Sequence, residues 1–305
     1  MTDLLRDRAA TDVAVRPLRS DDVVEGEQLA WDALEGAGRR YGFDMGVRDA
    51  ERIAFAQERM RYLLTTDPDG CFVAEQDGEV VGVALALRRG SLWFLSLLTV
   101  REGLQGAGIG RRLLDPAVAY GSDCSAAMIC ASPDPKALRR YGQAGFALHA
   151  GFEATGQPRR DRLPGGLGVR DGDWDTDREL ADELITARRG EPYGADLDWC
   201  RARGMRLIVR DGIGRDDRAV ALLNESRIAM LAATSDDAAV RTLWTAIAQA
   251  GPADHVRIPY LHSRQQWALG VALEAGLSLS PSDALATRGD LLVPPSPYLP
   301  SGILG

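Results

Sequence analysis

The sequence predicts a mixed α/β fold that occurs twice in tandem, each copy a twisted, mainly antiparallel sheet flanked by helices. Three observations lead to this fold class. Apolar stretches with strand character alternate with stretches of helical periodicity. A glycine-rich segment joins one of the strands to a helix, and the same order of elements restarts near the middle of the 305 residues. A chain of this length is long enough for two domains.

The composition excludes several classes of protein. The formal net charge of −8 argues against a general nucleic-acid binder, because phosphate contacts need clustered Lys and Arg. No apolar run approaches the roughly 18 residues that span a bilayer, and residues 1–8 lack the apolar core of a secretion signal. Four Cys and three His form neither a C-x-x-C nor an H-E-x-x-H pattern, so we expect no metal site. We therefore expect a cytoplasmic monomer or homodimer without membrane or nucleic-acid partners.

The first elements follow from periodicity and capping residues. Residues 12–18 predict a short strand. Ser20 followed by two acids predicts the start of a helix that ends near residue 34. The glycine-rich residues 35–46 predict a loop, and apolar positions on one face of residues 48–64 predict a second helix.

The next strands carry stronger signals. Residues 71–75 and 80–87 alternate around Asp77-Gly78, a sequence typical of a β-hairpin. Residues 92–100 and 126–131 are apolar runs that favour buried strands.

The segment from Val100 to Arg112, V-R-E-G-L-Q-G-A-G-I-G-R-R, links one of these strands to a helix. Glycines at alternate positions leave the backbone N–H groups uncovered at a helix N-terminus, which predicts a cradle for phosphate. A Walker loop would end in Gly-Lys-Ser/Thr, and a dinucleotide fingerprint would read G-x-G-x-x-G. The segment has neither pattern.

Two motifs together resemble the GCN5-related N-acetyltransferases (GNAT). Gln105 to Gly110 reads Q-x-x-G-x-G, which is similar to the coenzyme A pyrophosphate loop of that family. About thirty residues on, Ala137 to Phe146 is similar to its A-x-x-x-Y-x-x-x-G-F signature. The resemblance implies two tandem GNAT-like domains and acetyl transfer from acetyl-CoA to a primary amine of a small molecule or peptide, with no metal.

The resemblance also implies roles for individual residues. Tyr141 is expected to be the general acid, and the N–H of Leu98 or Val100 to stabilise the oxyanion. The helix-loop-helix of residues 20–64 is expected to form a wall of the acceptor pocket. The expected acetyl-CoA site comprises Leu98, Thr99, Val100, Gln105, Gly106, Ala107, Gly108, Ile109, Gly110, Arg111, Arg112 and Asp134. Asp134 stands where the family often has Asn.

The second half is expected to be a degenerate copy. The Gly- and Pro-rich residues 153–168 resemble a linker, which places the domains at residues 1–157 and 158–305. In place of the glycine loop stands Ser235-Asp236-Asp237, which would cap a helix and repel phosphate. Ala272 occupies the position of Tyr141.

Some alternatives stay open at the level of sequence. The apolar run 92–100 has no carboxylate, so the amine would lose its proton to water, to Asp44 or another acid of the acceptor loop, or to no protein base. A non-catalytic acyl-CoA sensor and a nucleotide-binding protein are the rival functions. Ligand melting with acetyl-CoA, NAD and ATP, together with assays of thiol release, distinguishes them.

Overall fold

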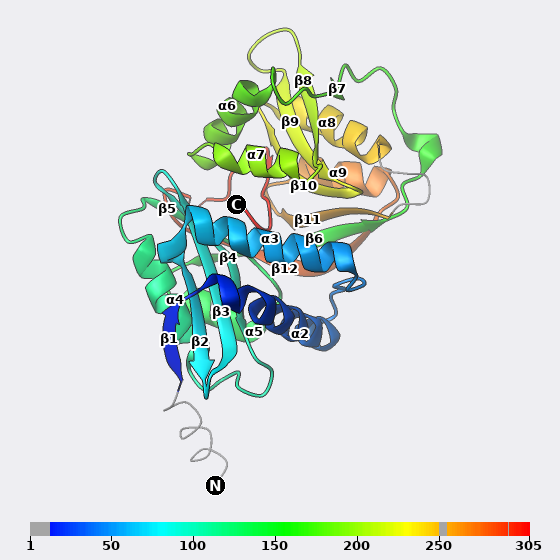
Figure 1. Ribbon diagram of the computed structural model, residues 1–305. Coiled ribbons are helices and arrows are strands. Elements are labelled where there is room, and N and C mark those ends of the chain that lie inside the picture. Colours follow the sequence, from blue (N-terminus) through cyan, green and yellow to red (C-terminus); the bar gives the residue numbers. More distant parts are fainter. Residues whose placement is uncertain (1–12, 250–254, 292) are drawn as a thin grey trace.

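The computed structural model describes residues 13–249, 255–291 and 293–305. All thirteen strands of these residues join in one mixed sheet, with helices on both of its faces (Figure 1). The predicted mixed α/β class is therefore confirmed. Residues 1–12 lie outside the described residues. They include the segment on which the expectation of no secretion signal depends and Asp12 of the first predicted strand.

The N-terminal half follows the predicted order of elements. The hairpin turn falls at Asp77 and Gly78, both with positive φ, as predicted. The elements are β1 (Ala14–Pro17), the 3-10 turn Ser20–Asp22, α2 (Val23–Tyr41), α3 (Ala50–Thr66), the 3-10 turn Pro68–Gly70, β2 (Cys71–Gln76), β3 (Glu79–Arg89), β4 (Leu92–Val100), α4 (Ile109–Tyr120), β5 (Ala126–Ala131), α5 (Pro135–Gln143) and β6 (Ala147–Gly156).

Helix α2 is longer than the sequence predicts. It passes through Gly36 and Gly38, which were expected in a loop, and ends at Tyr41 with Gly42 as a left-handed cap. Both glycines are buried, and a Cβ on Gly38 would lie 2.5 Å from the carbonyl oxygen of Phe43. Close packing of this turn against the following loop therefore outweighs the low helix propensity of glycine.

The second half repeats this order. Its elements are the 3-10 turn Arg160–Arg162, β7 (Arg170–Asp171), α6 (Arg178–Arg189), α7 (Ala195–Ala202), β8 (Arg206–Asp211), β9 (Arg218–Asn224), β10 (Arg227–Ala233), α8 (Asp236–Ala248), β11 (Val256–His262), α9 (Gln266–Glu274), β12 (Ser278–Gly289) and β13 (Tyr298–Leu299). The linker expected from residue 153 begins later, because β6 continues to Gly156 as a strand paired on both sides.

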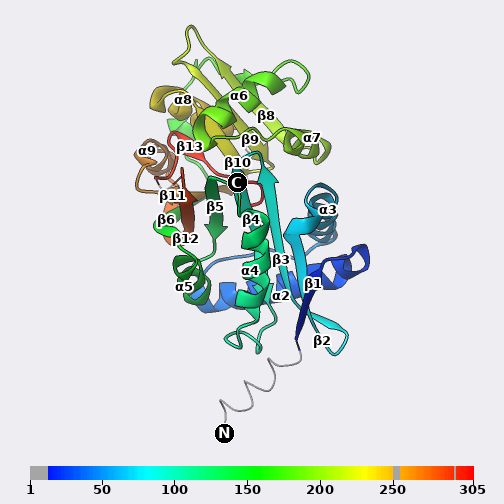
Figure 2. The ribbon, with the colours of Figure 1, turned by 90° about the vertical axis from the view of Figure 1, so that its left-hand side faces the viewer.

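The strand that follows α5 in the first half and the strand that follows α9 in the second half each lie beside the other half. The sheet order is β1-β2-β3-β4-β5-β12-β6-β11-β10-β9-β8-β7, so β12 pairs with β5 and β6 pairs with β11 (Figure 2). The exchanged strands β6 and β12 also pair with each other, from Ser278↔Thr155 to Thr287↔Ala147. The division of the chain at residue 157 stays a prediction, and both exchanged strands cross between the halves.

Apolar side chains separate the two faces of the sheet in the first half. One core lies under α4 and α5 and contains Leu113, Tyr141 and Ala284. The other lies under α2 and α3, contains Phe94 and Leu285, and continues into the second half. No helix of the described residues has the length and apolar character to cross a membrane.

Candidate functional site

The glycine-rich segment lies between the end of β4 and the start of α4, as predicted. Gly108 is the N-cap of α4 with φ 84°, and Gly106 has φ 95°. These values favour glycine, because a side chain with a Cβ is strained in the left-handed region. A Cβ on either glycine would meet no atom within 4 Å, so the backbone here borders open space.

The loop leaves several backbone donors without acceptors. Arg111 and Arg112 donate their amides to the carbonyl oxygen of Gly108. Among the described residues, nothing accepts from the amides of Gly106, Gly108, Ile109 and Gly110. No side chain caps α4 and no acid lies in its first turn. Free amides and the positive end of the helix dipole favour an anion such as phosphate at this position.

Strands β4 and β5 separate just before the loop. They pair in parallel from Leu92↔Ala126 to Leu95↔Ile129 and no further. A bulge in the β3–β4 pairing falls at Ser96, after which Leu97 to Val100 pair with β3 alone. One edge of β4 is therefore open beside Leu98, Thr99 and Val100, where an extended ligand can form strand-like hydrogen bonds.

Tyr141 is 5 % exposed and lies in the core under α4 and α5. Its hydroxyl donates no hydrogen bond to the described residues. Burial, with a smaller effect of Asp134, raises the pKa of Tyr141 well above its usual value. The phenol is therefore protonated at neutral pH, as a proton donor must be.

Several of the other predicted residues near the loop form hydrogen bonds or an ion pair within the protein. Asp134 caps α5, because its Oδ1 accepts from the amide of Lys136 at 2.8 Å. The Gln105 side chain donates to the carbonyl oxygen of Val100 at 3.2 Å, and Ala107 is half-buried between the glycines. Arg111 and Arg112 are exposed on the first turn of α4, and Arg111 lies 3.5 Å from Asp115.

The corresponding positions of the second half are closed. Ser235 caps α8 by accepting from the amide of Ala238, and Asp236 and Asp237 follow in the first turn, as predicted. Strand β10 pairs with β11 only at Arg227↔Arg257. Strand β13 covers the rest of this edge of β10, because Leu231 of β10 pairs with Leu299 and Ala232 pairs with Tyr298.

The two halves also match at the predicted tyrosine position. Phe146 donates its amide to the carbonyl oxygen of Tyr141, and Leu277 donates its amide to that of Ala272. The turns that follow both helices contain a glycine of positive φ, Gly145 and Gly276. This supports the alignment of Ala272 with Tyr141.

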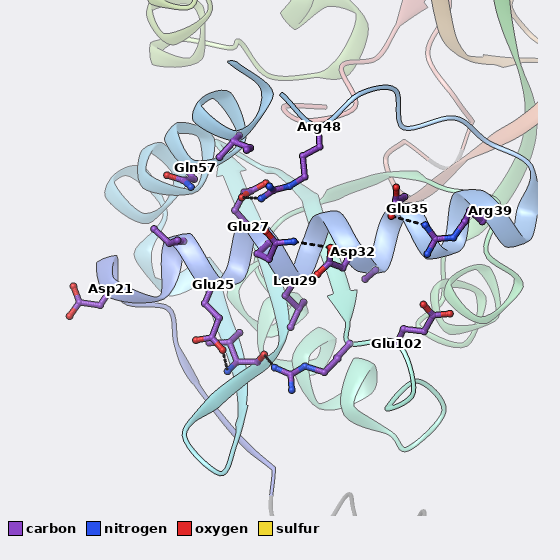
Figure 3. Close-up of a pocket in the computed structure, with 16 residues that line it drawn as sticks. Asp21, Glu25, Glu27, Leu29, Asp32, Glu35, Arg39, Arg48, Gln57 and Glu102 are labelled. Carbon is purple, nitrogen blue, oxygen red and sulfur yellow. Dashed lines mark hydrogen bonds and ion pairs between the residues drawn. The ribbon is translucent and has the colours of Figure 1, made fainter. Parts of the chain in front are cut away.

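A groove of about 940 Å³ follows α2 between α3 and the beginning of the glycine-rich segment (Figure 3). The expected helix-loop-helix wall lines it, and most of its charged groups are already paired. Glu27 binds Arg48, Glu35 binds Arg39 and Asp32 accepts from Gln28. Asp44, the expected alternative base, is exposed in the loop between α2 and α3 and accepts from the amide of Gly46. The described residues contain no group of His, Cys, Asp or Glu that could hold a metal ion.

The structure adds a group of polar residues that the sequence did not indicate. These residues come from strands of both halves and interact with one another in one group, called here the central polar cluster: Glu153, Arg227, Arg257, Tyr260 and Asp283. Glu153 and Asp283 are buried, and the other three are half-buried. Only the strand exchange brings these residues together. No local motif signals it.

Comparisons with known proteins agree with the fold. Residues 37–146 match the model of the acetyltransferase (GNAT) family. No curated protein matches the chain.

Three solved structures are similar over most of the chain. A protein from Pyrococcus horikoshii assigned as an acetyltransferase is 17% identical, with a TM-score of 0.74 over 97% of this chain and 96% of its own. A GCN5-related N-acetyltransferase from Sphaerobacter thermophilus is 15% identical, with a TM-score of 0.59 over 92% and 96%. Another from Kribbella flavida is 16% identical, with a TM-score of 0.56 over 91% and 71%. At these identities the likeness shows the fold, and it extends over both halves.

Proposed function

We propose that the chain is an acetyltransferase of the GNAT type, which transfers an acetyl group from acetyl-CoA to a primary amine, because residues 37–146 match the model of that family. The observation that carries the proposal is the uncapped N-terminus of α4 directly beside the open edge of β4. The amides from Gly106 to Gly110 suit a pyrophosphate, and the edge from Leu98 to Val100 suits the amides of a pantetheine arm.

The residues beside the open edge of β4 have different roles in the proposed reaction. The N–H of Leu98 or Val100 stabilises the oxyanion that forms when the amine attacks the thioester carbonyl. Tyr141 gives its proton to the departing thiolate, and its raised pKa keeps that proton available at neutral pH. Arg111 and Arg112 add positive charge near the phosphates from the helix surface.

The second half is proposed to bind no acetyl-CoA. Ser235 already caps α8, and the carboxylates of Asp236 and Asp237 repel phosphate. Strand β13 covers the edge of β10 that corresponds to the open edge of β4. Ala272 has no proton to donate.

The test is thiol release from acetyl-CoA with a panel of diamines, amino sugars, amino acids and peptides. The wild-type chain is expected to turn over at least one amine, with the product identified by mass spectrometry. Binding of acetyl-CoA without turnover of any amine would support the sensor instead. Melting shifts with NAD or ATP, and none with acetyl-CoA, would support a nucleotide-binding protein.

A further inference from the structure

Two β-bulges face each other across β6 in the middle of the sheet. In β11, the register with β6 shifts between Ile258 and Leu261, and in β12 it shifts between Pro281 and Ala284. Gly151 of β6 lies between them, where a Cβ would be 3.0 Å from a carbonyl oxygen on each side. Bulges redirect side chains and recur beside active sites.

Each bulge places one polar residue in the central polar cluster. Tyr260 has φ 58°, which is strained for a residue with a Cβ. Asp283 is 9 % exposed, and none of the ion pairs among the described residues includes it. Two cations, Arg257 and Arg227, favour its charged form without forming an ion pair with it, and Arg257 is paired with Glu153. A buried carboxylate without an ion-pair partner is costly, so it calls for a functional explanation.

Asp283 lies close to the end of β5 at which β5 separates from β4 and a gap opens between the two strands. Beyond Ile129, β5 leaves β4 and pairs only with β12, where Ala131 lies opposite Ala284. Asp283 is the next residue of β12, one strand away from that end of the gap. Neighbouring strands are about 4.8 Å apart, so a group that enters this end of the gap comes within one or two strand spacings of Asp283.

Asp283 also lies on the opposite face of the sheet from Tyr141. Ala284 and Ala286 pack under α4 and α5 with Tyr141, whereas Leu285 packs in the core under α2 and α3. Cys130 of β5 packs against that second core and interacts with Asp283. An acyl thioester bound from the side of α4 therefore has Tyr141 on one face and Asp283 on the other.

The C-terminal segment reinforces this arrangement. After β13 it crosses from the second half to the gap, where Ser96 donates its hydroxyl to the carbonyl oxygen of Ile303 at 2.9 Å. A Cβ on Gly302 would lie 2.7 Å from the hydroxyl of Tyr260. The segment thus connects the bulge of β4 with the central polar cluster.

We propose that Asp283, contributed by the exchanged strand of the second half, is the catalytic base that takes the proton from the attacking amine. The inference rests on the proposed acetyl transfer. The amine nitrogen forms a bond to the thioester carbonyl carbon and gives an N–H proton to the Asp283 carboxylate. As the C–S bond breaks, the thiolate takes its proton from Tyr141. Asp283 then releases its proton to water, and water restores the proton of Tyr141.

The surroundings suit a base at neutral pH. Burial, with a smaller effect of Glu153, raises the pKa of Asp283 to about 6, while Arg257 and Arg227 oppose the rise. Tyr260 and Cys130 are the other titratable groups that interact with it, and burial raises the pKa of both, so they stay neutral. Asp283 is therefore mostly ionised at pH 7 and mostly protonated below pH 5.

The test compares Asp283→Asn with the wild-type chain, using the amine found by the screen. At pH 8 we expect kcat to fall by about 10²-fold or more, the usual effect of removing a general base. The ratio of the wild-type kcat to the variant kcat does not depend on the titration of the amine, because both enzymes use the same substrate. This ratio should approach one below pH 5 and rise as the pH increases through 6. Titration of acetyl-CoA into the variant should show unchanged affinity.

Asp290→Asn is the matched control, because Asp290 is an exposed acid that follows the other end of β12, where Gly289 pairs with Ala126. It should keep the wild-type rate. A wild-type rate in Asp283→Asn, a ratio that does not vary with pH, or a loss confined to Asp290→Asn would overturn the inference and leave the proposed function intact. A wild-type chain that acetylates no amine would instead refute the proposed function, and the inference with it.

A second variant leaves Asp283 in place. Arg227→Gln removes a positive charge that lowers the pKa of Asp283, so the midpoint of the pH–rate profile should move to higher pH. A midpoint that stays at the wild-type value would overturn the assignment even if Asp283→Asn does not fold.

Discussion

Replacing Asp283 with Asn should make the protein more stable at neutral pH. Burial raises the pKa of Asp283 to about 6, from an ordinary value of 3.8. The folded protein therefore prefers the protonated acid, and this contribution to stability is fully present below pH 3.8 and lost as the pH rises through 6. A pKa difference of about 2 between the folded and unfolded chains corresponds to about 3 kcal/mol in the free energy of unfolding. Asn stays neutral and does not incur this loss.

The assay is urea unfolding of both proteins between pH 4 and pH 8. The difference in the free energy of unfolding should be smallest at pH 4 and should grow, in favour of Asp283→Asn, by about 2 kcal/mol as the pH rises to 8. A constant difference between pH 4 and pH 8 would refute the reasoning, because it would show that Asp283 titrates alike in the folded and unfolded chains. A difference that changes in favour of the wild-type chain between pH 4 and pH 8 would refute it as well.

Three further predictions concern the loop, the acid and a buried histidine. Tyr141→Phe should lower kcat by about 10²-fold or more while the affinity for acetyl-CoA, measured by calorimetry, stays nearly unchanged; full turnover would remove Tyr141 from the mechanism. Gly108→Asp should retain the circular dichroism spectrum but bind no acetyl-CoA, because it places a carboxylate at the N-terminus of α4. Gly108→Ala is the control, because it adds a strain of about 1–2 kcal/mol at φ 84° but no charge. Equal affinity of the wild type, Gly108→Asp and Gly108→Ala for acetyl-CoA would show that the ligand binds elsewhere. Burial lowers the pKa of His262 to about 4, so the stability that its neutral form provides should be lost as the pH falls from 6.5 through 4. His262→Gln should lose less stability than the wild type in urea unfolding over that interval, and identical pH profiles would contradict this.

Local patterns predicted most of the first half. The Asp77-Gly78 turn and the glycines before α4 need positive φ values that few other residues adopt, so the sequence marks them directly. Ser235 likewise shows from the sequence alone that α8 has a capped N-terminus. The position of Ala272 could be inferred because the glycine that ends each helix keeps the two halves in register.

The strand exchange could not be predicted from the sequence. Strands β6 and β12 occupy equivalent positions in the two halves, and each has edges that could pair within its own half or with the other. Pairing partners of this kind depend on the whole sheet. The central polar cluster depends on the exchange, since Glu153 and Asp283 are distant in sequence and meet only across β6 and β12. The extension of α2 through Gly36 and Gly38 likewise results from tertiary packing that overrides helix propensity.

Calorimetric titration of the full chain with acetyl-CoA tests the central claim most directly, that one half of a doubled fold holds the thioester. The free amides at α4 and the open edge of β4 predict a single site. The capped α8 and the covered edge of β10 predict none in the second half. The expected result is one acetyl-CoA per chain. A stoichiometry of two, or no binding at all, would contradict the account.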